Sequence, residues 1–292
     1  MITIQNDLIQ AGIQEKGAEF ARLRSIRTGL DYLWEADPTY WGRHSCILFP
    51  VIGATRNDII RVNGQKYPMQ KHGIVRDREF ELIEQSVDRV TYATRSDNET
   101  IKSYPFDFEL LVTYSLDENT LHIDYEVTTD GEEHLPFSIG GHPAFNCPLY
   151  GDQKRSDYKL VFSDPEDQHS PLLSEAGLLR EKTKMILDNA TTLTIEDELF
   201  DEDALILSDL KSDSVSFVGP NGRPSLTVSF GGFTHLGIWS KSRESPFVCI
   251  EPWYGHADPE NFDGEFRDKP GVVLLAPDEV FTCRHSVTVE SA

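Results

Sequence analysis

Two segments of the sequence place histidines where proton transfer could occur. Histidine exchanges its proton near neutral pH, and His72 lies in segment 71–77 beside a glycine, an arginine and an aspartate. His142 follows two glycines, which allow a ligand to approach closely, and precedes a proline, which favours an extended backbone at the histidine. We therefore predict that His142 is mounted rigidly on a strand end. The simpler readings are a surface turn for His72 and a satisfied core histidine for His142.

A third segment places a carboxylate in an apolar run. Glu251 follows residues 247–250, which are all apolar, and precedes Pro252. A buried carboxylate is costly unless it is paired or has a function, and burial raises its pKa toward the range of a general base. The alternative is a glutamate that points to water where Pro252 ends the strand.

Two histidines and a glutamate are also a potential set of metal ligands. His72, His142 and Glu251 are scattered singly, however, and form none of the closely spaced histidine pairs typical of metal sites. The sequence also lacks a glycine-rich phosphate loop and a nucleophile elbow. We therefore expect no metal. The cysteines lie among apolar residues without CxxC spacing and are expected to be buried thiols: Cys46, Cys147, Cys249 and Cys283.

The elements that position these side chains are predicted to be strands. Apolar and polar residues alternate in segment 121–128, which is the pattern of a half-buried strand. Asn63-Gly64 indicates a hairpin turn, and further turn signals separate the strands. The same alternation recurs in segments 89–96, 109–116, 214–219, 225–230, 235–240 and 279–289.

Helical periodicity is scarce. We expect short helical turns only around 37–42 and 172–184, and the polar segment 164–177 reads as a loop. Many short strands with regular turns are typical of a sandwich or barrel. The prediction is an all-β chain that forms one large antiparallel β-sandwich domain over residues 1–292.

The net charge of the chain limits the classes of molecule that it is expected to bind. Lysine and arginine number 27 against 49 aspartates and glutamates, a net charge of −22. Such a surface repels nucleic acid and anionic membranes, which are held mainly through cations. An anionic substrate would need a local cluster of arginines. No stretch approaches the roughly 20 apolar residues of a membrane helix, and the first residues do not resemble a signal peptide. We expect a cytoplasmic protein with a small-molecule partner and find no indication of its oligomeric state.

Taken in order, the segments resemble the aldose 1-epimerase family, and within it the LacX-type bacterial branch of galactose mutarotase-related proteins. The resemblance covers nearly the whole chain. The matching segments are 17–19, 31–34, 37–41, 47–50, 72–73, 104–106, 137–145 and 250–253.

This resemblance implies a galactose mutarotase-like supersandwich with a sugar cleft on the concave face of one sheet. It also implies interconversion of the α and β anomers of an aldohexose without a cofactor. Glu251 resembles the general base that takes the anomeric proton, and His142 the general acid that protonates the ring oxygen. His72 resembles the second histidine near that oxygen. Residue types alone leave open which histidine is the acid.

The resemblance also suggests substrate contacts. Asp203 resembles an acceptor for sugar hydroxyls, with Asp201 as its rival, and Trp253 could present an apolar face to the ring. Arg43 and Arg76 resemble arginines that reach a phosphate in related hexose-6-phosphate epimerases.

The main departure lies before His72, where segment 52–57 replaces the Asn-Arg pair of galactose mutarotases, so galactose is not implied as the substrate. The alternatives are therefore a hexose-6-phosphate 1-epimerase and a non-catalytic carbohydrate-binding module, with a metal-dependent cupin-like enzyme further away.

Overall fold

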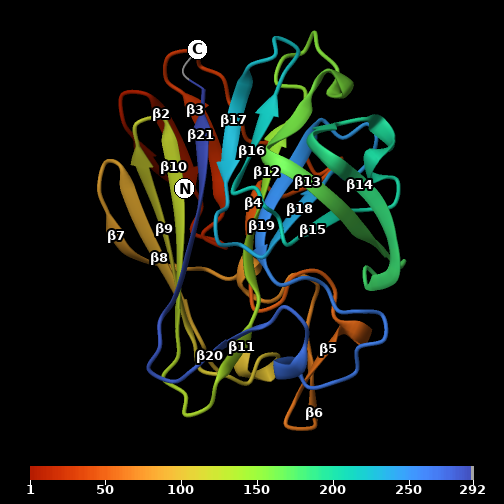
Figure 1. Ribbon diagram of the computed structural model, residues 1–292. Coiled ribbons are helices and arrows are strands. Elements are labelled where there is room, and N and C mark those ends of the chain that lie inside the picture. Colours follow the sequence, from red (N-terminus) through yellow and green to blue (C-terminus); the bar gives the residue numbers. More distant parts are fainter. Residues whose placement is uncertain (291–292) are drawn as a thin grey trace.

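The computed structural model describes residues 1–290, and its elements are almost all strands (Figure 1). The strands are β1 (Ile2–Gln5), β2 (Ile9–Ile13), β3 (Phe20–Ser25), β4 (Ser45–Leu48), β5 (Ile59–Val62), β6 (Gln65–Pro68), β7 (Glu81–Gln85), β8 (Arg89–Arg95), β9 (Glu109–Asp117), β10 (Thr120–Thr128), β11 (Leu135–Phe137), β12 (Ile139–Asn146), β13 (Lys159–Leu173), β14 (Leu179–Thr194), β15 (Leu205–Ser208), β16 (Ser214–Val218), β17 (Pro224–Ser229), β18 (His235–Trp239), β19 (Phe247–Tyr254), β20 (Val273–Leu275) and β21 (Phe281–Val289). The helices within residues 1–290 are short 3-10 turns: η1 (Arg56–Asp58), η2 (Val75–Asp77), η3 (Thr100–Lys102), η4 (Arg155–Asp157), η5 (Asp197–Phe200) and η6 (Phe266–Asp268). The prediction of an all-β chain is confirmed.

Two large antiparallel sheets form the body of the molecule. The nine-stranded sheet has the order β14-β13-β16-β17-β21-β10-β9-β8-β7, and the five-stranded sheet has the order β15-β18-β19-β12-β4. Smaller sheets join β1-β2-β3, β5-β6 and β11-β20. The predicted β-sandwich is confirmed, and its five-stranded sheet carries the two central strands β12 and β19.

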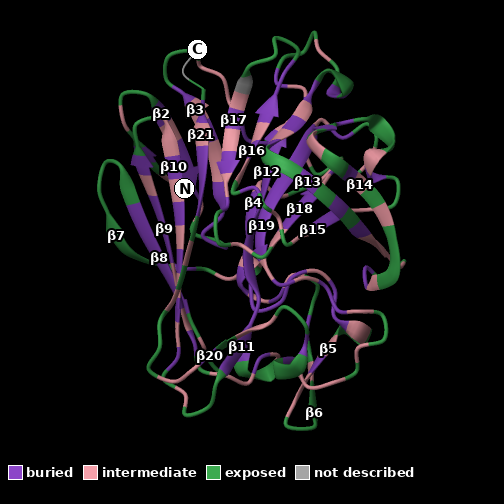
Figure 2. Cartoon of the chain, viewed as in Figure 1, coloured by how far each residue is buried: buried purple, intermediate pink, exposed green. Residues whose placement is uncertain are grey.

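The main hydrophobic core lies between the two large sheets, because one contiguous apolar cluster takes side chains from both. Leu121 and Ile123 of β10 are buried in it, as their alternation predicts, together with Val248 and Ile250 of β19. Figure 2 shows the buried residues running along the strands of both sheets. On each strand of the five-stranded sheet, the side chains of one face therefore pack into this core.

The segment predicted as a loop, 164–177, is largely strand, because β13 extends to Leu173. Alternate β13 positions are buried but polar, so hydrophobic alternation does not reveal them. These side chains bond to backbone at and beyond β15: Gln168 donates to the Ser208 carbonyl at 3.0 Å, and the Ser170 hydroxyl accepts from the Ile206 amide at 2.9 Å. The predicted helical turn at 172–184 is therefore also wrong, since most of it is strand.

Two other local predictions agree with the structure. Asn63-Gly64 joins β5 to β6 as a hairpin, with Val62 paired to Gln65. Around 37–42 the Trp41 amide donates to the Asp37 carbonyl at 2.9 Å, which closes a single turn. In residues 1–290 there is no helix with the length and apolar character needed to cross a membrane.

Candidate active site

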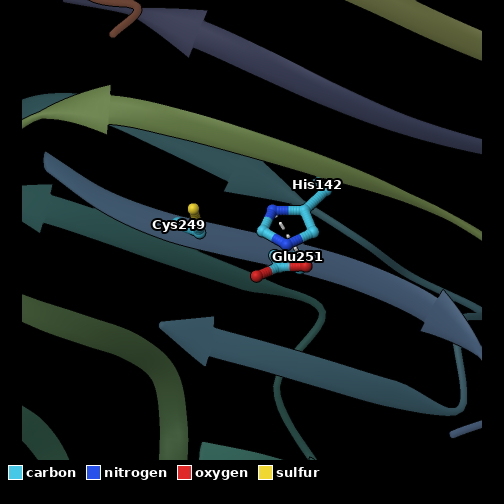
Figure 3. A group of neighbouring side chains, drawn as sticks. All are labelled: His142, Cys249 and Glu251. Atoms are coloured by element: carbon cyan, nitrogen blue, oxygen red, sulfur yellow. Dashed lines mark ion pairs between the residues drawn. The ribbon is translucent and has the colours of Figure 1, made fainter. Parts of the chain in front are cut away.

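His142 and Glu251 face each other across the two central strands. The β12–β19 ladder pairs Gly140 with Trp253 and Ala144 with Cys249, and the three positions between them on each strand are unpaired in this ladder. His142 and Glu251 occupy the middle of this interval. His142 Nδ1 lies 3.3 Å from Glu251 Oε2, the contact drawn in Figure 3.

Prolines explain the interrupted ladder. Pro143 follows His142 and Pro252 follows Glu251, and a proline has no amide hydrogen to donate. Each strand continues because it keeps its outer neighbour, β4 or β18. The expectation that His142 lies at a strand end is therefore wrong: it stands in the middle of β12. Pro252 likewise does not end its strand, and Glu251 is 1% exposed.

His72 is mounted on a strained turn beside the pair. Its φ is 68°, a left-handed conformation that few non-glycine residues adopt. Two contacts with Gly53 hold it: the His72 amide donates to the Gly53 carbonyl at 2.9 Å, and the Gly53 amide donates to His72 Nδ1 at 3.2 Å. Position 73 requires glycine, because a Cβ on Gly73 would lie 2.0 Å from the Phe49 carbonyl oxygen.

Aromatic rings surround His142. Trp41 stacks on it, with ring centroids 4.7 Å apart, and Trp239 and His72 meet it edge-on at 5.6 and 5.5 Å. This apolar cover removes water from the imidazole and lowers the pKa of His142 to about 3. Burial also holds the pKa of His72 well below its usual value.

Burial acts in the opposite direction on Glu251, because it disfavours the charged carboxylate. The pKa of Glu251 is therefore raised well above its usual value, and the positive charge of Lys71 partly counteracts that rise. His142 Nδ1 and Glu251 Oε2 have no hydrogen-bond partner within the described residues, although they are close. The pair thus favours a state in which both groups are uncharged and one proton is held by the carboxyl.

A cavity of about 230 Å³ opens over these side chains. It contains three cations, Lys71, Arg76 and Lys241, in a chain of strongly negative net charge. The lining residues are Trp41, Ile52, Gly53, Lys71, His72, Arg76, His142, Leu173, Gly177, Asp203, Ala204, Ile206, Trp239, Lys241, Glu251, Trp253 and Ala257.

Most of the predicted site residues meet at this cavity. Arg76, Asp203 and Trp253 line it together with the three central residues. Arg43 is not among the lining residues; it donates to Asp77 at 2.9 and 3.2 Å. Asp201, the rival of Asp203, accepts from Arg243 at 2.9 Å and also lies outside the lining.

Trp253 lies flat on the sheet because its neighbours are glycines. A Cβ on Gly237 would be 2.4 Å from the indole ring, and one on Gly140 would be 2.6 Å from it. The indole therefore forms part of the cavity wall, and its Nε1 is buried without a partner in residues 1–290.

The lining residues that sequence reasoning missed include two tryptophans and two lysines: Trp41, Trp239, Lys71 and Lys241. Lys71 directly precedes His72, so its position was visible in the motif. Trp239 continues the alternation of β18 that begins at Gly237, which places it on the face that carries Glu251.

The cysteines are mostly buried, as expected: Cys46, Cys147 and Cys249 are buried, Cys283 is partly exposed, and all four are free. Cys249, for which a buried thiol was expected rather than a metal ligand, joins His142 and Glu251 in a buried group whose ligand atoms lie within 4.8 Å of one another. The expectation that the chain holds no metal remains a prediction.

Comparisons with known proteins agree with one another. A family profile described as aldose 1-epimerase matches residues 1–272. The chain is 34% identical to the chromosomal LacX protein of Lactococcus lactis subsp. lactis over 297 aligned positions, covering 99% of both chains. It is 31% identical to a galactose mutarotase-related enzyme from Lactobacillus acidophilus, with a TM-score of 0.94, covering 99% of this chain and 97% of the other. A galactose mutarotase-like protein from Lactobacillus casei gives 31% identity and a TM-score of 0.93, covering 99% and 100%.

Proposed function

The chain belongs to the aldose 1-epimerase family, and from this premise we propose that it interconverts the α and β anomers of an aldohexose by opening and reclosing the sugar ring. The observation that carries the proposal is the pair formed by Glu251 and His142, the proposed base and the proposed acid, which lie 3.3 Å apart at the cavity. Ring opening needs one proton removed from the anomeric hydroxyl and one delivered to the ring oxygen. Two adjacent groups of opposite role suit this requirement.

In the proposed reaction, the Glu251 carboxylate takes the proton from the anomeric hydroxyl while protonated His142 gives a proton to the ring oxygen. The bond between C1 and the ring oxygen breaks as the C1 carbonyl forms. Rotation about the C1–C2 bond presents the other face of the aldehyde, and the reverse transfers close the other anomer. Every step is carried by side chains of this chain.

The protonation states follow from the raised pKa of Glu251 and the lowered pKa of His142. The uncharged pair and the charge-separated pair contain the same number of protons, so one proton shift across the 3.3 Å contact interconverts them. The charge-separated form suits the closed ring. The uncharged form, which burial favours, is the one left after opening and suits the open-chain aldehyde. Lys71 assists by favouring the ionised Glu251.

His72 has a different proposed role. Because its Nδ1 accepts from the Gly53 amide, a neutral ring carries its proton on Nε2. With a pKa held well below its usual value, His72 stays neutral and acts as a hydrogen-bond donor near the ring oxygen. The pKa of His142 is also lowered, but His142 lies 3.3 Å from Glu251 and can exchange a proton with it. This contact favours His142 as the proton donor and His72 as the group that steadies the developing charge.

The proposal is tested by following anomer equilibration of freshly dissolved α-glucose, α-galactose and glucose 6-phosphate, by polarimetry or NMR. The native protein should accelerate at least one, and His142→Asn should lose about 10²–10⁴-fold of that acceleration. Full activity in His142→Asn would contradict the mechanism. No acceleration across a broad sugar panel, with sugar binding intact, would favour the carbohydrate-binding module.

A phosphorylated sugar is the second candidate, and the cations Lys71, Arg76 and Lys241 of the cavity favour it. Arg76 has a buried Nε without a hydrogen-bond partner among the described residues. Arg43, the other predicted phosphate contact, would have to exchange its partner Asp77 to reach an anion. Arg76→Ala should therefore raise KM for glucose 6-phosphate more than Arg43→Ala does, and should leave KM for glucose nearly unchanged. Equal losses on both sugars would remove the phosphate role.

A further inference from the structure

Three different ligand types gather beneath the cavity. Cys249 and Glu251 are two apart on β19 and so project to the same face, and His142 stands opposite Glu251 on β12 (Figure 3). An imidazole nitrogen, a thiol sulfur and a carboxylate oxygen from these residues lie within 4.8 Å of one another. All three residues are buried: His142 is 6% exposed, Glu251 1% and Cys249 0%.

The group is short of partners. His142 Nδ1 and Glu251 Oε2 are buried and make no hydrogen bond to any described residue. A buried polar atom without a partner lowers the stability of the fold. Two such atoms beside a free thiol can be satisfied at once by one ion placed among them.

The ligand chemistry selects the class of ion. Nitrogen, sulfur and oxygen together suit Zn²⁺ and similar thiophilic cations, whereas Mg²⁺ and Ca²⁺ prefer oxygen alone. Bonds of roughly 2.0–2.3 Å in tetrahedral geometry place ligand atoms roughly 3.3–3.8 Å apart. Because only one ligand is sulfur, its target separations are about 3.5 Å, so separations of at most 4.8 Å need to close by about 1.3 Å at most. Side-chain rotations on two neighbouring strands can provide this.

We propose that His142, Cys249 and Glu251 form a binding site for a thiophilic divalent cation of the zinc type, with its fourth coordination position facing the cavity, and that the bound cation blocks proton transfer by His142 and Glu251. The binding part of this inference stands on the three side chains alone. Only the inhibition part rests on the proposed function.

The surrounding charges include groups that oppose the binding of a cation and one that favours it. Lys71, Arg76 and Lys241 line the same cavity and repel a cation, and Asp203 attracts it. Binding also displaces protons from the thiol and from the His142–Glu251 pair, so the net charge of the site rises by less than two. Thiolate coordination then distinguishes this ion from one held merely by charge.

The binding test uses the full chain, free of any histidine tag, titrated with Co²⁺ and followed by its thiolate charge-transfer absorption, then with Zn²⁺ by calorimetry. One equivalent should bind, Mg²⁺ should not compete, and Cys249→Ser should lose the absorption band and weaken Zn²⁺ by more than the 10–100-fold typical of an outer-shell change. Cys147→Ser, which changes a buried cysteine outside the group of His142, Cys249 and Glu251, should keep both.

A second variant guards against a folding defect in the first. Glu251→Gln keeps the side-chain volume, and it should keep the band while weakening Zn²⁺ to a similar extent. A native protein without a thiolate band, or equal Zn²⁺ affinity in native and Cys249→Ser, would overturn the site.

Inhibition is measured separately. Zn²⁺ should slow anomer equilibration by the native protein in proportion to occupancy, and Cys249→Ser should require a correspondingly higher concentration. Turnover that persists with Zn²⁺ bound would overturn the inhibition. A protein that accelerates no sugar yet gives the band would fail the proposed function and keep the metal site.

Discussion

The two faces of β19 are equally buried and chemically opposite. Val248 and Ile250 point into the core shared with the nine-stranded sheet, and both are 0% exposed. Cys249 and Glu251, their direct neighbours, point to the other face and are 0% and 1% exposed. On that face two small apolar clusters, one containing Trp253 and one containing Cys249, flank the polar pair.

The comparison separates stability from function within one strand. The core face gains free energy from burial, at about 25 cal/mol per Å² of apolar surface. The cavity face leaves buried polar atoms without partners, which lowers stability and keeps those atoms available to a ligand. Substitutions on the two faces should therefore fail in different ways.

The largest effect is expected from Glu251→Gln. Anomer equilibration should slow by about 10²–10⁴-fold, because the base is lost while the shape is kept. Stability should not fall at pH 7. The raised pKa of Glu251 contributes its full stability below the unfolded value of about 4.3, and this contribution is lost as pH rises through the higher folded value. The variant therefore gains on the native protein with increasing pH. Chemical unfolding across a pH series checks this; a strong loss of stability would erase the distinction between the faces.

Ile250→Ala tests the opposite face. Removing these buried methyl groups should cost about 2–5 kcal/mol of unfolding free energy. The rate per folded molecule should fall far less than in Glu251→Gln. Urea unfolding and activity normalised to folded protein give the two numbers, and a variant that is stable but inactive would reverse the assignment of the faces.

Gly237→Ala should have an intermediate effect. A new Cβ 2.4 Å from the Trp253 ring must push the indole from its place, and such overpacking costs about 1–3 kcal/mol. Because Trp253 lines the cavity, the KM for the sugar substrate should rise as well. Gly151→Ala is the matched control, since no atom lies within 4 Å of a Cβ there. Equal behaviour of the two variants would mean that the indole is not held by contact with the sheet.

The last prediction concerns a buried histidine on the core side, whose effect emerges only as the pH falls. His285 of β21 packs behind Gly141, whose Cβ would lie 3.0 Å from its ring, and burial lowers the pKa of His285 to about 3. The unfolded chain, with a pKa near 6.5, binds this proton first. Stability should therefore fall as pH drops from about 6.5 to 3, by up to about 1.4 kcal/mol per pH unit from this group. His285→Phe should make the acid slope shallower, and coincident slopes would contradict this.

Sequence patterns predicted the strands wherever one face was apolar. Segment 121–128 alternates in both polarity and burial, so β10 was readable. β13 was not, because Glu166, Gln168 and Ser170 occupy its buried positions and form hydrogen bonds with backbone groups elsewhere in the chain. An alternation of polar and apolar residues reveals the buried face of a strand only when the buried residues are apolar.

The sequence predicted which residues form the site better than it predicted where those residues lie in their strands. His72, His142 and Glu251 do meet, but His142 was expected at a strand end and Pro252 was weighed as a strand terminator. Proline is normally excluded from central strands, and here β12 and β19 each contain one beside the residue that matters. Local rules are expected to fail at functional sites. For Arg43 the residue type was read correctly but its partner was not, since a motif cannot reveal that the guanidinium donates to Asp77.

The two prolines have a mechanical consequence. β12 and β19 are tied to each other at Gly140–Trp253 and at Ala144–Cys249, and the ladder leaves the stretch between these ties unpaired. A strand advances about 3.4 Å per residue, so this unclamped window is roughly 14 Å long. A proton passes readily between atoms about 2.7–2.9 Å apart, closer than the 3.3 Å seen here. We expect this unpaired window to let His142 and Glu251 approach each other by about half an ångström while the paired residues on either side hold the sheet in place.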